Sequence, residues 1–268
     1  MNKSKLSLIW SLIITWIAQA SGKFLPTGTI TGEFLRVYLG IKKGLTPQEA
    51  SSSVFADLII ATFSLFLLAL LSLIYLVINN ENFFSGEYSN FLLWSIFIVF
   101  VGCILFYLFV KKRLTKYLMR KIREKFKFSL KKNIVKIILK IDHSMYQLSK
   151  KKLIVFKSII YRLLGWIAGA IEIYVFLLII GIESTIQDVI IIEAFLGVIR
   201  AVVFFIPAGL GVQELAFVII GEYVGFSSSI SFSIALGRRV REVLVGVPAV
   251  IAWAVFFRNS NGKIKGSH

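Results

Sequence analysis

The stretch "LIIATFSLFLLALLSLIYLVI", from Leu58 to Ile78, contains no charged residue and decides the class of fold. A second uncharged stretch, from Phe91 to Val110, follows it. A helix of about 20 apolar residues is long enough to cross the hydrocarbon core of a bilayer, which is roughly 30 Å thick. Because 57% of all residues are hydrophobic, the sequence predicts an all-α fold, a polytopic bundle of transmembrane helices, and excludes an ordinary soluble domain.

Most of the net charge of +17 lies in residues 111–152, which hold 16 Lys or Arg residues against Glu124 and Asp142. Lys and Arg accumulate on the cytoplasmic side of membrane proteins, where anionic headgroups attract them. We therefore expect segment 111–152 and the basic C-terminus, Arg258 to His268, to be cytoplasmic in a multi-pass protein of the inner (plasma) membrane. The expected partners are anionic membrane lipids and not nucleic acid, and the oligomeric state stays open.

Residue types that usually carry catalysis or bind metals are scarce. The chain has a single cysteine, Cys103, and two histidines, His143 and His268, which argues against a disulfide framework and a metal site. The sequence lacks a nucleotide-binding glycine loop, a Gly-x-Ser-x-Gly elbow, a His-Glu-x-x-His helix and an Asp-x-Asp pair. We expect no catalytic residue, no cofactor and no bound metal.

The chain contains an internal repeat. The segment "FLPTGTITGEFLRVYLGIKKGL" begins at Phe24, and "FIPAGLGVQELAFVIIGEYVGF" begins at Phe205. The residues shared at a constant offset are Pro26, Gly28, Glu33, Gly40 and Gly44 in the first copy and Pro207, Gly209, Glu214, Gly221 and Gly225 in the second. Matches without a gap predict that the two segments have the same local structure.

Three expected membrane crossings separate the two copies, so the second should be inverted relative to the first. The predicted repeats cover about residues 7–78 and 186–257. Proline removes a backbone donor and glycine permits close backbone approach, so each motif suits a Pro/Gly-broken re-entrant hairpin of the kind that lines transporter cavities. A kinked helix with small residues for packing remains the alternative.

Charged residues inside apolar segments are the candidates for a site, because an unpaired charge in hydrocarbon costs several kcal/mol. Glu33 and Glu214 occupy equivalent positions of the repeat. At the same offset Asp57 falls on Arg238, so these two residues could form an ion pair between the halves. Glu172, Glu193 and Arg200 also lie in apolar surroundings, but they have no repeat partner and rank lower.

The segment "LGRRVREVLVGVPAVIAW" concentrates basic residues on a predicted helix. Arg238, Arg241 and Glu242 share one face by their spacing, with Arg239 about 100° away, and arginine's planar fork suits a phosphate. Our hypothesis is that these arginines, with both repeat glutamates, line a hydrated cleft for a lipid phosphate headgroup. The alternative is that the charges only neutralise one another, for example Arg238 with Glu242.

At these residues the chain resembles a known family. The segments "FIPAGLGVQE", "FLPTGTITGEFLRVYL", "ASSSVFADL" and "RRVREVLVGVPAVIAW" are similar to the flippase-like membrane region of lysylphosphatidylglycerol synthases, most of all to the hopanoid-associated subgroup. The resemblance implies an inner-membrane lipid flippase, or a lipid-transport component, without a particular substrate. Together with the arginines, it leads us to expect a phosphate-bearing or hopanoid-like lipid in a cleft between the inverted repeats. It does not identify that lipid, the direction of movement or the energy source.

Two departures from the family pattern affect the prediction. Family members usually have one or two further helices before the first proline motif, and a start shortened relative to the family would explain their absence here. The soluble aminoacyl-transferring domain of the synthases is also missing, so we do not expect lysyl transfer. Two other functions remain open: a membrane scaffold that recruits partners through its basic loop, and an integral lipid-modifying enzyme that uses Glu33 or Glu214 as a base.

Overall fold

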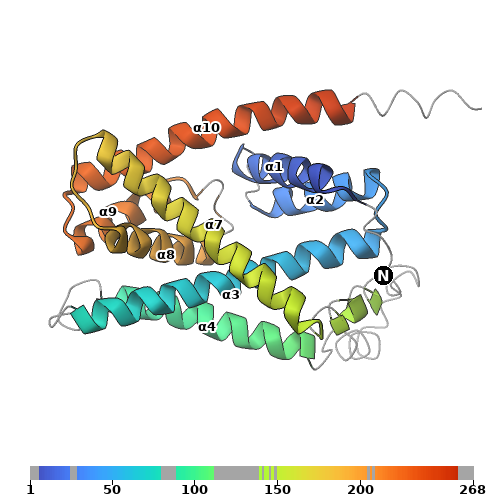
Figure 1. The fold of residues 1–268 in the computed structure, drawn as a ribbon, viewed down its shortest axis with the longest axis horizontal. Helices are drawn as coiled ribbons and strands as arrows, with labels where there is room; N and C mark the ends of the chain where they lie inside the picture. Colours follow the sequence, from blue (N-terminus) through green and yellow to red (C-terminus); the bar gives the residue numbers. More distant parts are fainter. Residues whose placement is uncertain are drawn as a thin grey trace, which may run out of the picture.

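A computed structural model describes residues 6–24, 29–79, 89–111, 139–140, 142–144, 146–147, 150–203, 206 and 209–258. Its helices are α1 (Leu8–Phe24), α2 (Thr29–Lys42), α3 (Pro47–Asn79), α4 (Ser89–Lys111), α7 (Lys152–Ile179), α8 (Ile186–Val202), α9 (Val212–Val224) and α10 (Ser228–Arg258) (Figure 1). The described residues contain no strand, which confirms the predicted all-α class for this part of the chain.

Among the described residues, the helices long and apolar enough to cross a membrane are α3 and α7. They contain 33 and 28 residues, which corresponds to about 50 and 42 Å and exceeds the roughly 30 Å of a hydrocarbon core. Large apolar side chains such as Leu71, Ile78 and Leu164 are exposed on them. An extensive exposed apolar surface of this kind fits contact with lipid better than contact with water.

Helix α8 forms the centre of the molecule, where it packs against α3, α4, α7 and α9. Its residues 191–199 are all buried and, apart from Glu193, all apolar, as expected for a helix that is enclosed on every side. The helix begins at a capping box, in which Asp188 N donates to Thr185 Oγ1 at 3.2 Å and Thr185 N donates to Asp188 Oδ2 at 3.0 Å. A polar start and an apolar body therefore place this helix in the core.

The long helices α3 and α10 lie along opposite sides of the molecule and run in opposite directions (Figure 1). The pairs α1–α2 and α8–α9 lie between them, towards opposite ends. Each pair packs on the long helix that follows it, since α2 contacts α3 and α9 contacts α10. Each pair also contacts the long helix of the other half, since α1 packs on α10 and α8 packs on α3.

The turns that lead into α3 and α10 have the same geometry. Gly44 has a φ of 99° and Gly225 a φ of 101°, values at which a side chain would be strained. Leu45 N donates to Gly40 O at 3.1 Å, and the equivalent Phe226 N donates to the carbonyl of Gly221 at 2.8 Å. The repeat seen in the sequence therefore has matching local structure at this turn.

Candidate functional site

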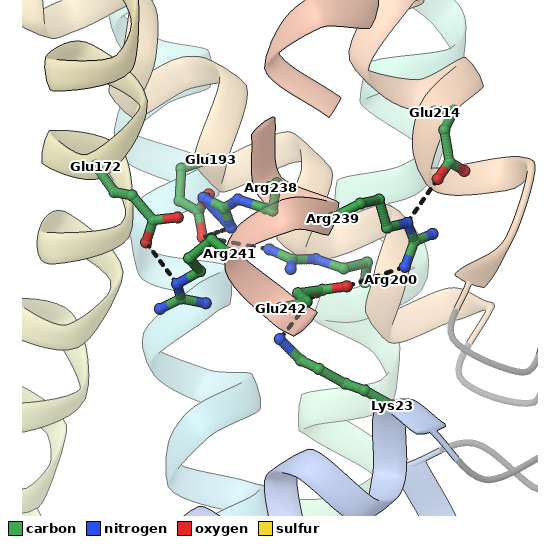
Figure 2. A network of polar contacts seen from close by, with 9 residues as sticks. All are labelled: Lys23, Glu172, Glu193, Arg200, Glu214, Arg238, Arg239, Arg241 and Glu242. Atoms are coloured by element: carbon green, nitrogen blue, oxygen red, sulfur yellow. Dashed lines mark hydrogen bonds and ion pairs between the residues drawn. The ribbon is translucent and has the colours of Figure 1, made fainter. Parts of the chain in front are cut away.

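Nine charged residues gather around the middle of α10, where side chains from α1, α7, α8 and α9 meet those of α10 (Figure 2). We call this group the central network. It consists of Lys23 from α1, Glu172 from α7, Glu193 and Arg200 from α8, Glu214 from α9, and Arg238, Arg239, Arg241 and Glu242 from α10. Helices far apart in the sequence thus bring carboxylates and cations together in otherwise apolar surroundings.

The most buried part of the network is the pair Arg238 and Glu193, whose side chains are 6% and 3% exposed. Arg238 donates to the two carboxylate oxygens of Glu193 at 2.6 and 3.3 Å and to the carbonyl of Gly169 at 3.2 Å. Arg200 donates to the same carboxylate at 3.2 Å. A Cβ at Gly169 would lie 2.9 Å from Glu193 Oε1, so the absence of a side chain at this position on α7 makes room for the carboxylate.

Arg239 connects the second part of the network. Its guanidinium donates to Glu214 at 2.7 Å and to Glu242 at 3.0 Å. Glu242 also pairs with Lys23 at 2.8 Å, which links the end of α1 to the middle of α10. The other oxygen of Glu214 accepts the backbone N–H of Gly211 at 2.8 Å and so caps the start of α9.

The outer edge of the network is more accessible. Arg241 pairs with Glu172 at 3.1 Å, and its side chain is 48% exposed. The Lys23 side chain is 37% exposed. Together the nine residues carry five positive and four negative charges, so the network has one positive charge in excess, with two of its cations at its edge. This arrangement can receive one anionic group.

A second charged group joins α2, α3 and α7; we call it the Asp57 cluster. Asp57 accepts from Arg36 at 2.5 Å, and it accepts from Arg162 through both oxygens, one of them at 3.1 Å from Nε. Glu33 completes the cluster, with an oxygen 3.8 Å from Arg36 Nη1. As Glu193 does in the central network, one carboxylate here bridges two arginines.

The structure brings together five of the predicted site residues: Glu214, Arg238, Arg239, Arg241 and Glu242. Glu33 and Asp57 instead lie in the other cluster. Gly209 is described, with a φ of 60°, whereas Pro26, Gly28 and Pro207 lie outside the described residues, as does segment 112–138 of the predicted cytoplasmic stretch 111–152.

Two predicted ion pairs are wrong. Asp57 does not pair with Arg238, because arginines on α2 and α7 occupy its oxygens. Arg238 does not pair with Glu242 four residues away, because it points towards Glu193 on α8 while Glu242 binds Lys23 and Arg239. In both cases a charged residue on another helix is the partner, and not the residue that the sequence spacing suggested.

Several residues of both clusters were missed or ranked low from the sequence. Glu193, Arg200 and Glu172 are direct partners of the predicted arginines, and Arg36 and Arg162 hold Asp57. A usable signal existed for α8, since Glu193 and Arg200 are seven residues apart and therefore share one helical face. Among the described residues, no three His, Cys, Asp or Glu side chains gather as metal ligands would.

The comparison with known families decides the identity of this fold. The family model described as the lysylphosphatidylglycerol synthase TM region matches residues 2–249. The chain belongs to this family. The family match spans every residue of the central network and of the Asp57 cluster. Membership makes the chain a membrane protein of a lipid-handling family, as the resemblance predicted. No curated protein and no solved structure matches the chain, and the hopanoid-associated subgroup stays a prediction.

Proposed function

We propose that this chain is a lipid translocator of the plasma membrane, built on two inverted repeats with re-entrant hairpins. In this proposal the central network receives the phosphate of a lipid headgroup while the acyl tails stay in the bilayer. Segment 111–152 and the C-terminus lie on the cytoplasmic side, where their basic residues meet anionic lipid.

The lengths of four helices support the re-entrant arrangement. α1, α2, α8 and α9 contain between 13 and 17 residues, about 20–26 Å, which is less than the roughly 30 Å of hydrocarbon. The exchanged packing, α1 on α10 and α8 on α3, supports an inverted relation between the halves. Helices that end inside the protein leave backbone groups that a polar substrate can meet.

The observation that carries the proposal is the excess positive charge of the central network. Burying paired charges in apolar surroundings is costly, and replacing them by apolar residues is often neutral or stabilising, so stability alone does not explain nine of them. A phosphodiester anion would neutralise the excess charge and accept hydrogen bonds from the arginines. Headgroup passage along such a path avoids moving a charge through hydrocarbon.

Gln213 adds a second observation at the same end of α9. Its side chain is buried next to Glu214 in the chain, yet its amide nitrogen has no hydrogen-bond partner within the described structure. Leaving a buried donor unsatisfied costs about 1–3 kcal/mol. A headgroup oxygen bound near the start of α9 would satisfy it.

The proposal is tested with the purified protein in liposomes that contain either NBD-labelled phosphatidylglycerol or NBD-labelled phosphatidylcholine, whose headgroup has no net charge. Dithionite quenches the outer leaflet, and translocation appears as loss of protection of the inner leaflet. We expect wild type to move phosphatidylglycerol faster than empty liposomes do. Wild type that matches empty liposomes with both lipids would contradict translocation and would favour the scaffold function.

The role of the excess charge is tested by Lys23→Gln. This variant leaves Glu242 paired with Arg239 but makes the network neutral, so we expect phosphatidylglycerol movement to fall about tenfold, which corresponds to 1.4 kcal/mol, with a smaller effect on phosphatidylcholine. Lys157→Gln is the matched control, because Lys157 is exposed on α7 outside both clusters. Equal rates for Lys23→Gln and wild type would remove the excess charge from the mechanism.

A further inference from the structure

The two glutamates that the repeat makes equivalent have different environments. Glu214 is fully engaged, since one oxygen accepts from Arg239 at 2.7 Å and the other from the backbone N–H of Gly211 at 2.8 Å. The carboxylate of Glu33 lies 3.8 Å from Arg36 Nη1, which is beyond hydrogen-bond distance. Both oxygens of Glu214 therefore have a hydrogen-bond donor, whereas the buried oxygen Oε2 of Glu33 has none within the described structure.

The oxygen Oε2 of Glu33 is buried and has no hydrogen-bond partner within the described structure. Its nearest cation, Arg36, donates instead to Asp57 at 2.5 Å. A buried carboxylate oxygen without a donor is unfavourable, and adding a proton removes the charge that causes the cost. The geometry thus leaves Glu33 as the carboxyl group that can change its protonation at least cost to the rest of the cluster.

The charges around Glu33 come from three helices. Arg36 lies on its own helix, Asp57 on α3 and Arg162 on α7, and these three groups act on it. From α1, which also packs on α2, the charged residue in the described structure is Lys23, and it is paired with Glu242. Two arginines therefore face two carboxylates, so the cluster is neutral when Glu33 is ionised and has one excess positive charge when it is protonated.

We propose that Glu33 is a proton-binding site. Its protonation gives the cluster an excess positive charge and so allows Arg36 and Arg162 to bind an anionic phosphate headgroup. The proton and the headgroup then bind together, and their charges cancel. When Glu33 is ionised, it supplies the negative charge that balances the arginines and so competes with the phosphate. This inference rests on the proposed function, because it couples lipid movement to a proton.

Coupling predicts that translocation depends on pH in a defined direction. At about pH 8, wild type should move NBD-labelled phosphatidylglycerol about tenfold more slowly than at about pH 5, because a higher pH favours the ionised form of Glu33. Glu33→Gln is neutral at every pH, so it should be fast throughout and exceed wild type at the upper end. Glu183→Gln is the matched control, because Glu183 is exposed between α7 and α8, and it should keep the wild-type profile.

A second measurement does not require lipid movement. Infrared difference spectra of the detergent-solubilised protein between the same two pH values should show a protonated carboxyl band that Glu33→Gln removes and Glu183→Gln retains. If the band is found but no lipid moves, translocation fails and the proton site stands. If lipid moves while Glu33→Gln retains both the wild-type pH profile and the band, the proton site fails and translocation stands.

Discussion

Replacing Glu193 by glutamine is expected to lower the free energy of unfolding by about 3–5 kcal/mol. The carboxylate of Glu193 binds two arginines, Arg238 at 2.6 Å and Arg200 at 3.2 Å. Without it, Arg238 keeps the carbonyl of Gly169 as its partner in the described structure and becomes a buried charge without a counter-ion. In the wild type the ion pair offsets the cost of removing this charge from water. In the variant that cost is no longer offset, and the folded state is less stable.

Unfolding of the purified protein by SDS in mixed micelles, followed by circular dichroism, would measure this loss. Glu172→Gln is the matched control, because Glu172 also pairs with an arginine but at the accessible edge of the network. Ion pairs in contact with solvent contribute about 0–1 kcal/mol, so this variant should stay within that range. Similar losses for the two variants would show that burial does not set the strength of these pairs.

Replacing Gly32 by alanine should be the second most damaging change, with an expected loss of at least about 1–3 kcal/mol. A Cβ at Gly32 would lie 2.4 Å from the carbonyl oxygen of Ala18 and 3.3 Å from the Cα of Gly22. Both contacts are with the backbone of α1, which cannot rotate away as a side chain can. The variant must therefore separate α1 from α2, where small residues allow the two helices to pack closely.

The same unfolding measurement can compare Gly32→Ala with Gly165→Ala. A Cβ at Gly165, inside α7, would have no atom within 4 Å in the described structure. Alanine is favoured over glycine inside a helix by about 0.8–1.0 kcal/mol, so Gly165→Ala should be neutral or stabilising. A stable Gly32→Ala variant would contradict the close contact between α1 and α2.

The helical class and the candidate arginines were predictable because they depend on local sequence. An uncharged stretch as long as Leu58–Ile78 is typical of a transmembrane helix. The repeat made Gly44 and Gly225 equivalent, and the structure shows that both have a positive φ. The membership of the family was predictable from motifs for the same reason. Inversion of the repeats and the sidedness of segment 111–152 remain predictions.

The pairing of charges was not predictable in the same way. Spacing along α10 placed Arg238 near Glu242, and the repeat placed Asp57 opposite Arg238, yet both pairs are absent from the described structure. Partners were chosen by helix packing: α8 brings Glu193 to Arg238, and α7 brings Arg162 to Asp57. Sequence spacing reports neighbours on one helix but not which helix lies across from it.

By itself, the sequence determined that this protein is a helical membrane protein of a lipid-handling family, because apolar length and motif identity are properties of the chain. Only the tertiary structure decided that the charges form two clusters. It also decided that Glu214 accepts a hydrogen bond from Arg239, whereas Oε2 of Glu33 accepts none within the described structure. The physical reason is that a charge in apolar surroundings takes whichever opposite charge the packing brings within about 3 Å, and those partners come from helices remote in the sequence.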